Sequence, residues 1–332
     1  YNSTKGNNMI CKLTLKNIKS GSFSKRAIKD FFDKKNPIDK LNFSRSDFFT
    51  ESAKFAEGMS ISGVQQKLSL IINDNNEFEI VTTNGTYILK PSPESFPFAA
   101  ENEQCAMSIS RLVGIDTAFS ANIQFSDGED AYITKRYDRK NGNKFHQENL
   151  AQAFNLQSDD KYAKSYEEAL SLSRKMSGGK LSVVKELFNR IVLAYIIGND
   201  DMHLKNISLI KDTDNKTPFY DNLTPNYDQL LVHAFPNPPK IGFLALDLLK
   251  EEVDGIFSEK YNTCGFYTGY DFYVLGDRVG LRKPVIKSIL ENYFNKENDV
   301  IDIINNSFMP DEMKDKATSL IKDRIKALKI IE

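Results

Sequence analysis

The chain changes its hydrophobic periodicity near residue 145, and this change constrains the fold more than any other feature. From residue 58 onward, short apolar runs separated by turn residues predict one helix at 99–113 and strands at 67–72, 77–82, 86–90, 119–125 and 131–136. Beyond residue 145, apolar residues recur at helical spacing, most clearly over 181–198 and 313–328. The pattern therefore predicts an α+β fold in which a small mixed lobe precedes a larger, mainly helical lobe.

Three regions follow from this pattern. Residues 1–57 are interpreted as an N-terminal segment with short helices at 24–32 and 44–56, and residues 1–8 as a tag or leader because the first Met is Met9. Residues 58–145 form the mixed lobe and 146–332 the helical lobe.

The composition excludes several classes of protein. The 44 Lys and Arg residues balance 45 Asp and Glu residues, and a net charge of −1 argues against direct binding of nucleic acid over a broad surface. The three cysteines have no metal-type spacing, which favours a reducing compartment. No apolar run reaches the roughly 18 residues of a membrane span. We therefore expect a cytoplasmic protein without a membrane partner.

The loop at residues 198–206 carries the strongest chemical signal. Asp201 is followed five residues later by Asn206, with Lys205 between them. A phosphotransfer loop needs such a set, because a carboxylate orients or deprotonates the attacking hydroxyl, an amide holds a metal ion and a cation offsets charge on the phosphate. Asp, Asn and His are also common in turns and helix caps, so this loop alone is also compatible with an ordinary turn.

Three further motifs give the loop its weight. The turn at 60–67 offers the backbone N–H groups of Ser62, Gly63, Val64 and Gln65 to phosphate oxygens, although it also reads as a plain Ser/Gly turn. Lys90 ends a strand and Glu103 lies in the next helix, as in the Lys–Glu ion pair of kinases.

The third motif, at 223–228, ends in Asp228, which can complete a magnesium shell. Asp221 has a similar local sequence but is interpreted as a turn residue, because Asp228 follows a rigid Pro225 turn. These motifs follow one another in the order found in two-lobed kinases.

At this point the sequence resembles a known family, the HipA-type serine/threonine kinases of bacterial toxin–antitoxin systems. The similar segments are the Ser/Gly loop, the Lys strand, the helix Glu, the hinge, a His-Gln-Glu-Asn motif, the catalytic loop and the metal motif, at residues 60–67, 86–90, 102–103, 135–139, 146–154, 198–206 and 223–228. The resemblance covers about residues 58–300.

The resemblance implies ATP and Mg²⁺ as cofactors and a role for each matching residue. Asp201, rather than the adjacent Asp200, would be the catalytic base, and Asn206 and Asp228 would bind magnesium. Lys90 would contact the ATP phosphates.

In the hinge, Tyr137 would flank the adenine, and Lys135 stands where many members have Glu. His203 and Lys205 would stabilise the loop or face the phosphates, whereas His146 is expected to be structural. Ser60 and Ser62 are candidate autophosphorylation sites, because phosphate there would repel the phosphates of ATP.

The resemblance also implies partners. The substrate would be a protein, an aminoacyl-tRNA synthetase of tryptophanyl or glutamyl type, whose phosphorylation halts translation. The segment before the Ser/Gly loop is shorter than in full-length members, as in the short HipT-type toxins of three-gene systems. The expected antitoxins are a small HipS-like protein and a helix-turn-helix HipB-like protein, which would make any DNA contact.

Alternative interpretations remain open at this point. A small-molecule phosphotransferase of the aminoglycoside- or choline-kinase type shares the lobe order and the Asp/Asn loop. A catalytically silent kinase fold that acts as a binding module is a different class, and the presence of Lys90, Asp201, Asn206 and Asp228 disfavours it. An exported effector kinase with a host target is the third alternative.

Overall fold

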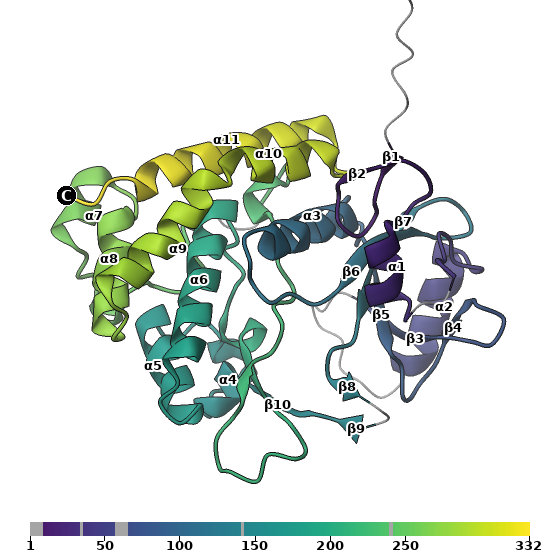
Figure 1. The fold of residues 1–332 in the computed structure, drawn as a ribbon, viewed down its shortest axis with the longest axis horizontal. Coiled ribbons are helices and arrows are strands. Elements are labelled where there is room, and N and C mark those ends of the chain that lie inside the picture. The colour runs from purple at the N-terminus through teal and green to yellow at the C-terminus, as the bar shows by residue number, and fades with distance from the viewer. Residues whose placement is uncertain (1–8, 34–35, 57–65, 141–142, 239–241) are drawn as a thin grey trace, which may run out of the picture. The chain divides into compact units, whose positions relative to one another are not determined.

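The computed structural model describes residues 9–33, 36–56, 66–140, 143–238 and 242–332, and the chain divides into two compact units. Unit 1 comprises Tyr1–Ser108, Ala118–Arg136 and Asn305–Met309. Unit 2 comprises Ile109–Thr117, Tyr137–Ile304 and Pro310–Glu332. Figure 1 shows the elements of both units, most of them labelled.

Unit 1 is built on a five-stranded antiparallel sheet with the strand order β4-β3-β5-β7-β6. These strands are β3 (Leu68–Ile72), β4 (Phe78–Ile80), β5 (Tyr87–Pro91), β6 (Ser120–Gln124) and β7 (Asp130–Lys135). Before the sheet come β1 (Met9–Ile10), β2 (Asn17–Ile18), α1 (Lys25–Phe31) and α2 (Arg45–Ala56). Helix α3 (Ala99–Leu112) connects β5 to β6, and its residues up to Ser108 belong to unit 1.

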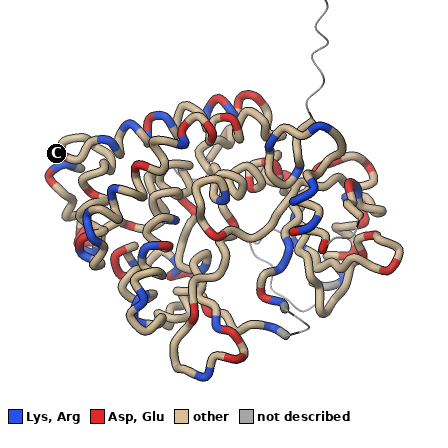
Figure 2. The backbone as a smooth tube through the Cα atoms, viewed as in Figure 1, with Lys and Arg blue, Asp and Glu red and all other residues tan. Residues whose placement is uncertain are grey.

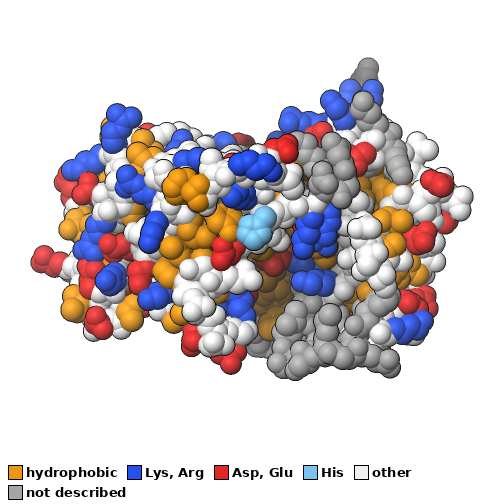
Figure 3. All heavy atoms as spheres, turned by 90° about the horizontal axis from the view of Figure 1, so that it is seen from below, with side chains coloured by type: hydrophobic (Ala, Val, Ile, Leu, Met, Phe, Trp, Pro, Cys, Tyr) orange, Lys and Arg blue, Asp and Glu red, His pale blue; other side chains and the backbone are white. Residues whose placement is uncertain are grey.

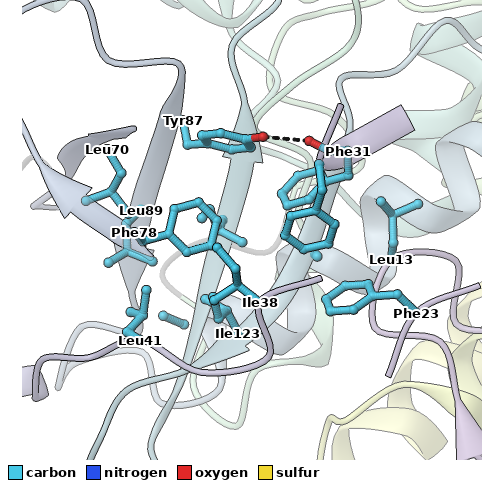
Figure 4. Close-up of a cluster of buried hydrophobic side chains, with 14 of the residues drawn as sticks. Leu13, Phe23, Phe31, Ile38, Leu41, Leu70, Phe78, Tyr87, Leu89 and Ile123 are labelled. Atoms are coloured by element: carbon cyan, nitrogen blue, oxygen red, sulfur yellow. Dashed lines mark hydrogen bonds between the residues drawn. The ribbon is translucent and has the colours of Figure 1, made fainter. Parts of the chain in front are cut away.

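The two faces of this sheet are covered by different parts of the chain. Alternate side chains on one face, including Leu70, Leu89 and Ile123, are buried against apolar residues of the N-terminal segment. Figure 4 shows this cluster, in which the Tyr87 hydroxyl donates a hydrogen bond of 2.6 Å to the carbonyl of Phe31. Fully burying a side chain such as Phe31 contributes about 1.5–3 kcal/mol. The N-terminal segment is therefore part of the core of unit 1.

The opposite face of the sheet carries polar residues that meet α3. Lys90 and Tyr132 are paired across β5 and β7, and Asn122 is paired with Tyr132 across β6 and β7. The Asn122 amide donates a hydrogen bond of 3.2 Å to the carbonyl of Ala100 in α3. The face that bears Lys90 is therefore also the face on which α3 lies.

The N-terminal segment also joins unit 1 to a distant part of the sequence. The backbone turns sharply at Leu15, which has a positive φ of 52°. The side-chain amide of Asn306 donates a hydrogen bond of 3.1 Å to the carbonyl of Leu15, across a sequence separation of 291 residues. Residues 305–309 therefore complete unit 1.

Unit 2 is mainly helical. Its helices are α4 (Leu150–Ala153), α5 (Tyr166–Met176), α6 (Leu181–Ile197), α7 (Glu259–Cys264), α8 (Gly269–Arg278), α9 (Lys283–Asn295), α10 (Glu297–Asn306, whose last two residues belong to unit 1) and α11 (Asp311–Leu328). Its strands are β8 (Arg139–Lys140), β9 (Asn143–Lys144), β10 (His146–Asn149), β11 (Ser208–Lys211) and β12 (Asn222–Leu223). Strands β10, β11 and β12 form a small antiparallel sheet.

Helix α6 is the central element of unit 2. It is buried almost all round and packs against α5 and α11 (Figure 1). It ends at Ile197 and is capped by Gly198, whose φ of 66° is the left-handed conformation that glycine adopts without strain. The loop at 199–207 therefore begins from a rigid helix end and leads directly into β11.

The sequence predictions for the regular elements are largely confirmed. The strands of the mixed lobe, the helices at 24–32, 44–56 and 99–113, and the long helices at 181–198 and 313–328 are all present within two residues of their expected ends. The α+β fold class is also confirmed. The pairing of β1 with β2, the strands β8, β9, β10 and β12, and the separate helices α4, α5, α7, α8 and α10 were not predicted.

Charges of both signs are interspersed along both units, as Figure 2 shows, and they are mixed with apolar side chains on the face seen in Figure 3. Among the described residues, no helix is long and apolar enough to cross a bilayer.

Candidate active site

The loop that follows α6 holds Asp201 and Asn206 in a fixed relation. The side-chain amide of Asn206 donates a hydrogen bond of 2.9 Å to the carbonyl of Asp201. The backbone supports this turn, because the N–H of His203 bonds to the same carbonyl at 2.8 Å and the N–H of Asn206 bonds to the carbonyl of His203 at 2.9 Å. The five-residue step therefore places the carboxylate and the amide at the two ends of one closed turn.

The two adjacent carboxylates of the loop have different surroundings. Asp200 is buried, and its Oδ2 accepts a hydrogen bond of 3.2 Å from the backbone N–H of Gly242 and lies 3.6 Å from Nε2 of His233. The Asp201 side chain is 48% exposed, and its Oδ1 accepts a hydrogen bond of 3.0 Å from the hydroxyl of Tyr162. Of the two, only Asp201 presents its carboxylate to solvent, where an acceptor hydroxyl could reach it.

The segment at 223–229 is tied to the loop at 199–207 on both sides of Asp228. The hydroxyl of Tyr227 donates a hydrogen bond of 3.2 Å to the carbonyl of Lys205 and lies 2.7 Å from the hydroxyl of Ser208. The amide of Asn199 donates a hydrogen bond of 3.1 Å to Oε1 of Gln229. The neighbours of Asp228 in sequence thus bond to the neighbour of Asn206 and to the start of the loop.

The backbone at Asp228 is unusual. Its φ of 51° lies in the left-handed region, which only a few per cent of non-glycine residues adopt and which Asp and Asn tolerate best. Such positions cluster at functional sites.

His203 and Lys205 do not have the surroundings of a general base. His203 is 6% exposed, its Nε2 lies 3.8 Å from Oδ1 of Asp201, and its Nδ1 is buried without a hydrogen-bond partner among the described residues. Burial lowers the pKa of His203, and the charges of Lys161 and Lys205 lower it further against the opposing charge of Asp201. The Lys205 ammonium bonds to the hydroxyl of Ser158.

The hinge residues are divided between the two units. Tyr137, in unit 2, stacks on Tyr227 with a centroid distance of 6.0 Å and an interplanar angle of 28°. Burial raises the pKa of Tyr137, so it remains a neutral phenol. Lys135, in unit 1, bonds to Oδ1 of Asp33 at 2.6 Å and to the carbonyl of Asp30 at 3.3 Å, so its ammonium is directed at the end of α1.

Unit 1 brings Lys90 and Glu103 together. The Lys90 ammonium lies 2.8 Å from Oε1 of Glu103, with side-chain exposures of 11% and 4%. The ammonium also lies 5.4 Å from the ring centroid of Tyr132, within the range of a cation–π contact. The next residue, Gln104, donates a hydrogen bond of 2.8 Å to the carbonyl of Leu13, which fixes this turn of α3 to the N-terminal segment.

The residues set aside from the sequence have structural partners. Asp221 accepts hydrogen bonds from the backbone N–H of Asp212 at 2.8 Å and from the amide of Asn215 at 2.7 Å, which confirms that it is a turn residue. His146 lies 3.0 Å from the hydroxyl of Tyr220 and stacks on its ring, as a structural histidine does. The predicted nucleotide-loop residues Ser60, Ser62, Gly63, Val64 and Gln65 lie outside the described residues.

Sequence reasoning missed three residues that hold the site together. Tyr162 bonds to Asp201 from the turn before α5, Gln229 joins the two loops, and Gln104 anchors α3. The only signal for Gln229 and Gln104 was their position next to a motif residue. Tyr162 had none, because it lies 39 positions from Asp201 in the sequence.

The available oxygen donors fit magnesium. The Asn206 amide N–H₂ is used within the loop, and its Oδ1 accepts no hydrogen bond from a described residue, so the amide oxygen can serve as a ligand. No group of three His, Cys, Asp or Glu residues that could hold a metal occurs in the described part of the chain. Magnesium in phosphotransferases needs no such cage, because one or two protein oxygens act together with water and substrate phosphates.

The fold and the loop define a kinase-like protein, and comparisons with known proteins agree. A family model of the HipA-like C-terminal domain matches residues 59–300. A Haemophilus influenzae protein named "Putative kinase" is 34% identical over 343 residues, which cover 97% of this chain and 98% of that protein. The chain therefore belongs to the HipA-like family, and its relatives support a kinase.

Two solved structures share the fold at low sequence identity. The first is the Shewanella oneidensis MR-1 toxin–antitoxin system HipA, HipB and operator DNA complex, with a TM-score of 0.63, 20% identity, and coverage of 82% of this chain and 66% of that chain. The second is the Helicobacter pylori proinflammatory kinase CtkA, with a TM-score of 0.53, 14% identity, and coverage of 82% of this chain and 91% of that chain. The chain thus spans about two thirds of the HipA chain that it matches.

Proposed function

We propose that this protein is an ATP- and Mg²⁺-dependent protein kinase that transfers the γ-phosphoryl group to serine or threonine. The observation that carries the proposal is the joining of two loops within unit 2. Tyr227 and Gln229, on either side of Asp228, bond to the loop that carries Asp201 and Asn206. This arrangement holds a candidate base and two candidate metal ligands on one support.

Each residue has a defined role in the proposed reaction. The exposed carboxylate of Asp201 accepts the proton of the acceptor hydroxyl or orients that hydroxyl for attack. Asn206 and Asp228 would hold magnesium, which neutralises charge on the β- and γ-phosphates when it is bound. Lys90, held by Glu103, would contact the phosphates and orient them.

Two further parts of the ATP site rest on the family resemblance. The backbone of residues 62–65 would cradle the phosphates. The neutral, stacked ring of Tyr137 offers an apolar surface beside the adenine. Phosphorylation of Ser60 or Ser62 would place about −1.5 to −2 units of charge in the phosphate cradle and reduce ATP binding.

We extend the proposal to the cellular role by family membership. The protein would be the toxin of a bacterial toxin–antitoxin system, act in the cytoplasm on an aminoacyl-tRNA synthetase of tryptophanyl or glutamyl type, and be neutralised by HipS-like and HipB-like antitoxins. The HipA structure with a similar fold is a complex with HipB and operator DNA, which supports an antitoxin partner of that kind. The near-neutral net charge supports DNA contact through such a partner.

Peptide mass spectrometry after incubation with Mg-ATP tests the proposal. We expect phosphate on Ser60 or Ser62 in the protein without a substitution and none in Asp201→Asn. Asp221→Asn is the matched control, because Asp221 is an aspartate of unit 2 whose side-chain hydrogen bonds lie within its own turn, and it should retain phosphorylation.

The alternatives give different outcomes. Phosphate that appears on an aminoglycoside or choline, and not on protein, would identify a small-molecule phosphotransferase. No phosphate on either, together with no ATP-dependent change in melting temperature, would identify a silent fold.

A further inference from the structure

The side chain of Tyr162 contacts the proposed base directly. Its hydroxyl donates the 3.0 Å hydrogen bond to Oδ1 of Asp201, and its ring meets the ring of His203 edge-to-face at a centroid distance of 5.3 Å. Burial raises the pKa of Tyr162, and the charge of Asp201 raises it further, so the phenol keeps its proton at neutral pH. Tyr162 is therefore the donor in this contact and Asp201 the acceptor.

The contact is part of a longer attachment between two segments of unit 2. The N–H of Leu204 bonds to the carbonyl of Lys161 at 3.2 Å, and the hydroxyl of Tyr166 donates a hydrogen bond of 2.8 Å to the carbonyl of Met202. The Lys205 ammonium bonds to the hydroxyl of Ser158. Residues on both sides of Tyr162 are thus attached to the loop that carries Asp201. These attachments fix the backbone at Tyr162 and hold its phenol near Asp201.

The next turn of the chain fixes the end of this segment. Ser165 is the N-cap of α5 and forms a capping box with Glu168, in which each side chain accepts a backbone N–H of the other residue. Tyr162 lies three residues before this cap, so α5 limits how far the phenol can move away from Asp201.

The geometry divides the two oxygens of Asp201 between different tasks. Oδ1 accepts the Tyr162 hydroxyl and is also the oxygen nearest to Nε2 of His203. Oδ2 accepts no hydrogen bond from any residue that the structure describes, and the side chain is 48% exposed. An acceptor hydroxyl that approaches the carboxylate from solvent therefore finds Oδ2 available.

We propose that Tyr162 is a positioning residue, which holds Oδ1 of Asp201 so that Oδ2 faces the acceptor hydroxyl. This role rests on the proposed kinase function of the same site. Rotation of an unsupported carboxylate would move the accepting oxygen away from the line of attack, and misplacement by about 1 Å can reduce a rate by a large factor. Tyr162 does not bind ATP in this scheme, so its loss should change the maximum rate and leave the dependence on ATP concentration unchanged.

The first test is the rate of self-phosphorylation by Mg-ATP in Tyr162→Phe, measured over a range of ATP concentrations. We expect a maximum rate about tenfold lower, because part of the effect of a positioned general base is lost, and a half-saturating ATP concentration within about twofold of the unmodified protein. Tyr166→Phe is the matched control, because it also removes one phenol hydrogen bond between the same two segments but leaves the carboxylate contact intact.

Two kinetic results would overturn the proposal. An equal loss of rate in Tyr166→Phe would show that the attachment of the loop matters and not the carboxylate contact. An unchanged or higher rate in Tyr162→Phe would show that the phenol is a bystander or covers the base.

The second test does not depend on catalysis. 3-Fluorotyrosine placed at position 162 reports the environment of the phenol by ¹⁹F NMR, with and without Asp201→Asn. Because the charge of Asp201 contributes to the raised pKa of Tyr162, we expect the phenol to ionise at a lower pH in Asp201→Asn. Identical titrations would refute the contact and hence the inference alone. A contact seen by NMR in a protein that transfers no phosphate would refute the proposed function and, with it, the role of Tyr162.

Discussion

Removing the charge of Glu103 should destabilise unit 1 more than removing any exposed carboxylate. The Lys90 ammonium lies 2.8 Å from Oε1 of Glu103, and both side chains are nearly inaccessible. At an effective dielectric constant of about 20, unit charges at this separation attract each other by about 6 kcal/mol, and desolvation of the two groups offsets much of this gain. Glu103→Gln leaves the Lys90 ammonium buried beside a neutral amide.

The expected loss is about 3 kcal/mol of unfolding free energy, the lower end of the range for breaking a buried ion pair, because the glutamine oxygen still accepts a hydrogen bond. Urea unfolding followed by circular dichroism measures the loss, and hydrogen exchange at β5 and α3 assigns it to unit 1. Glu291→Gln is the matched control, because Glu291 pairs with Lys287 at side-chain exposures of 51% and 65%, and it should cost less than about 0.5 kcal/mol.

The double variant Lys90→Met with Glu103→Leu separates charge from packing. Replacing both partners by apolar residues removes the buried charges, so the double variant should be more stable than Glu103→Gln, although it should be inactive. If Glu103→Gln costs no more than Glu291→Gln, the buried-charge reasoning is wrong.

Three further predictions concern other residues. Burial raises the pKa of Glu101 from 4.5 to about 7. The contribution of Glu101 to stability is therefore greatest below pH 4.5 and is lost as the pH rises through 7. The unfolding free energy of Glu101→Gln should exceed that of the protein without a substitution by up to about 3 kcal/mol at pH 8, and by much less at pH 5. Gly198→Ala should lower the unfolding free energy by about 1–2 kcal/mol because alanine is strained in the left-handed conformation, and further because its Cβ would overlap Leu320. Gly179 also has a positive φ but lies in open space, so Gly179→Ala should show only the backbone part of this loss in the same urea experiment. Asp228→Asn should keep its melting temperature, because Asn tolerates a φ of 51°, but magnesium should no longer increase the stabilisation by ATP in a thermal shift assay.

The helices and strands could be predicted from the sequence because the hydrophobic periodicity reflects which side chains are buried. The alternation around Leu68, Leu70, Tyr87 and Leu89 predicts strands with one buried face, and the structure has that face. The strands β1 and β2 have two residues each, which is too short for any period to be visible. The role of residues 9–56 in the core of unit 1 depends on contacts between distant segments, which no local pattern contains.

The same distinction applies to the candidate site. The spacing of Asp201 and Asn206 is a local property, so the closed turn that joins them could be anticipated. Which of the two aspartates is exposed is a tertiary property, because Gly242 and His233 enclose Asp200 and Tyr162 meets Asp201. Hydrogen bonds over long sequence separations leave no periodic trace, and this is why the supporting residues of the site were missed.

The hydrogen bond between Asn306 and Leu15 has a consequence for the order in which the protein is made. A ribosome synthesises Leu15 early and Asn306 only after α6 and the loop at 199–207, so this contact within unit 1 forms only after most of unit 2 has been produced. The contact that residues 305–309 add to unit 1 therefore forms long after Lys90 and Glu103 have emerged. A nascent chain therefore possesses the loop that carries Asp201 and Asn206 before the last segment of unit 1 has been synthesised.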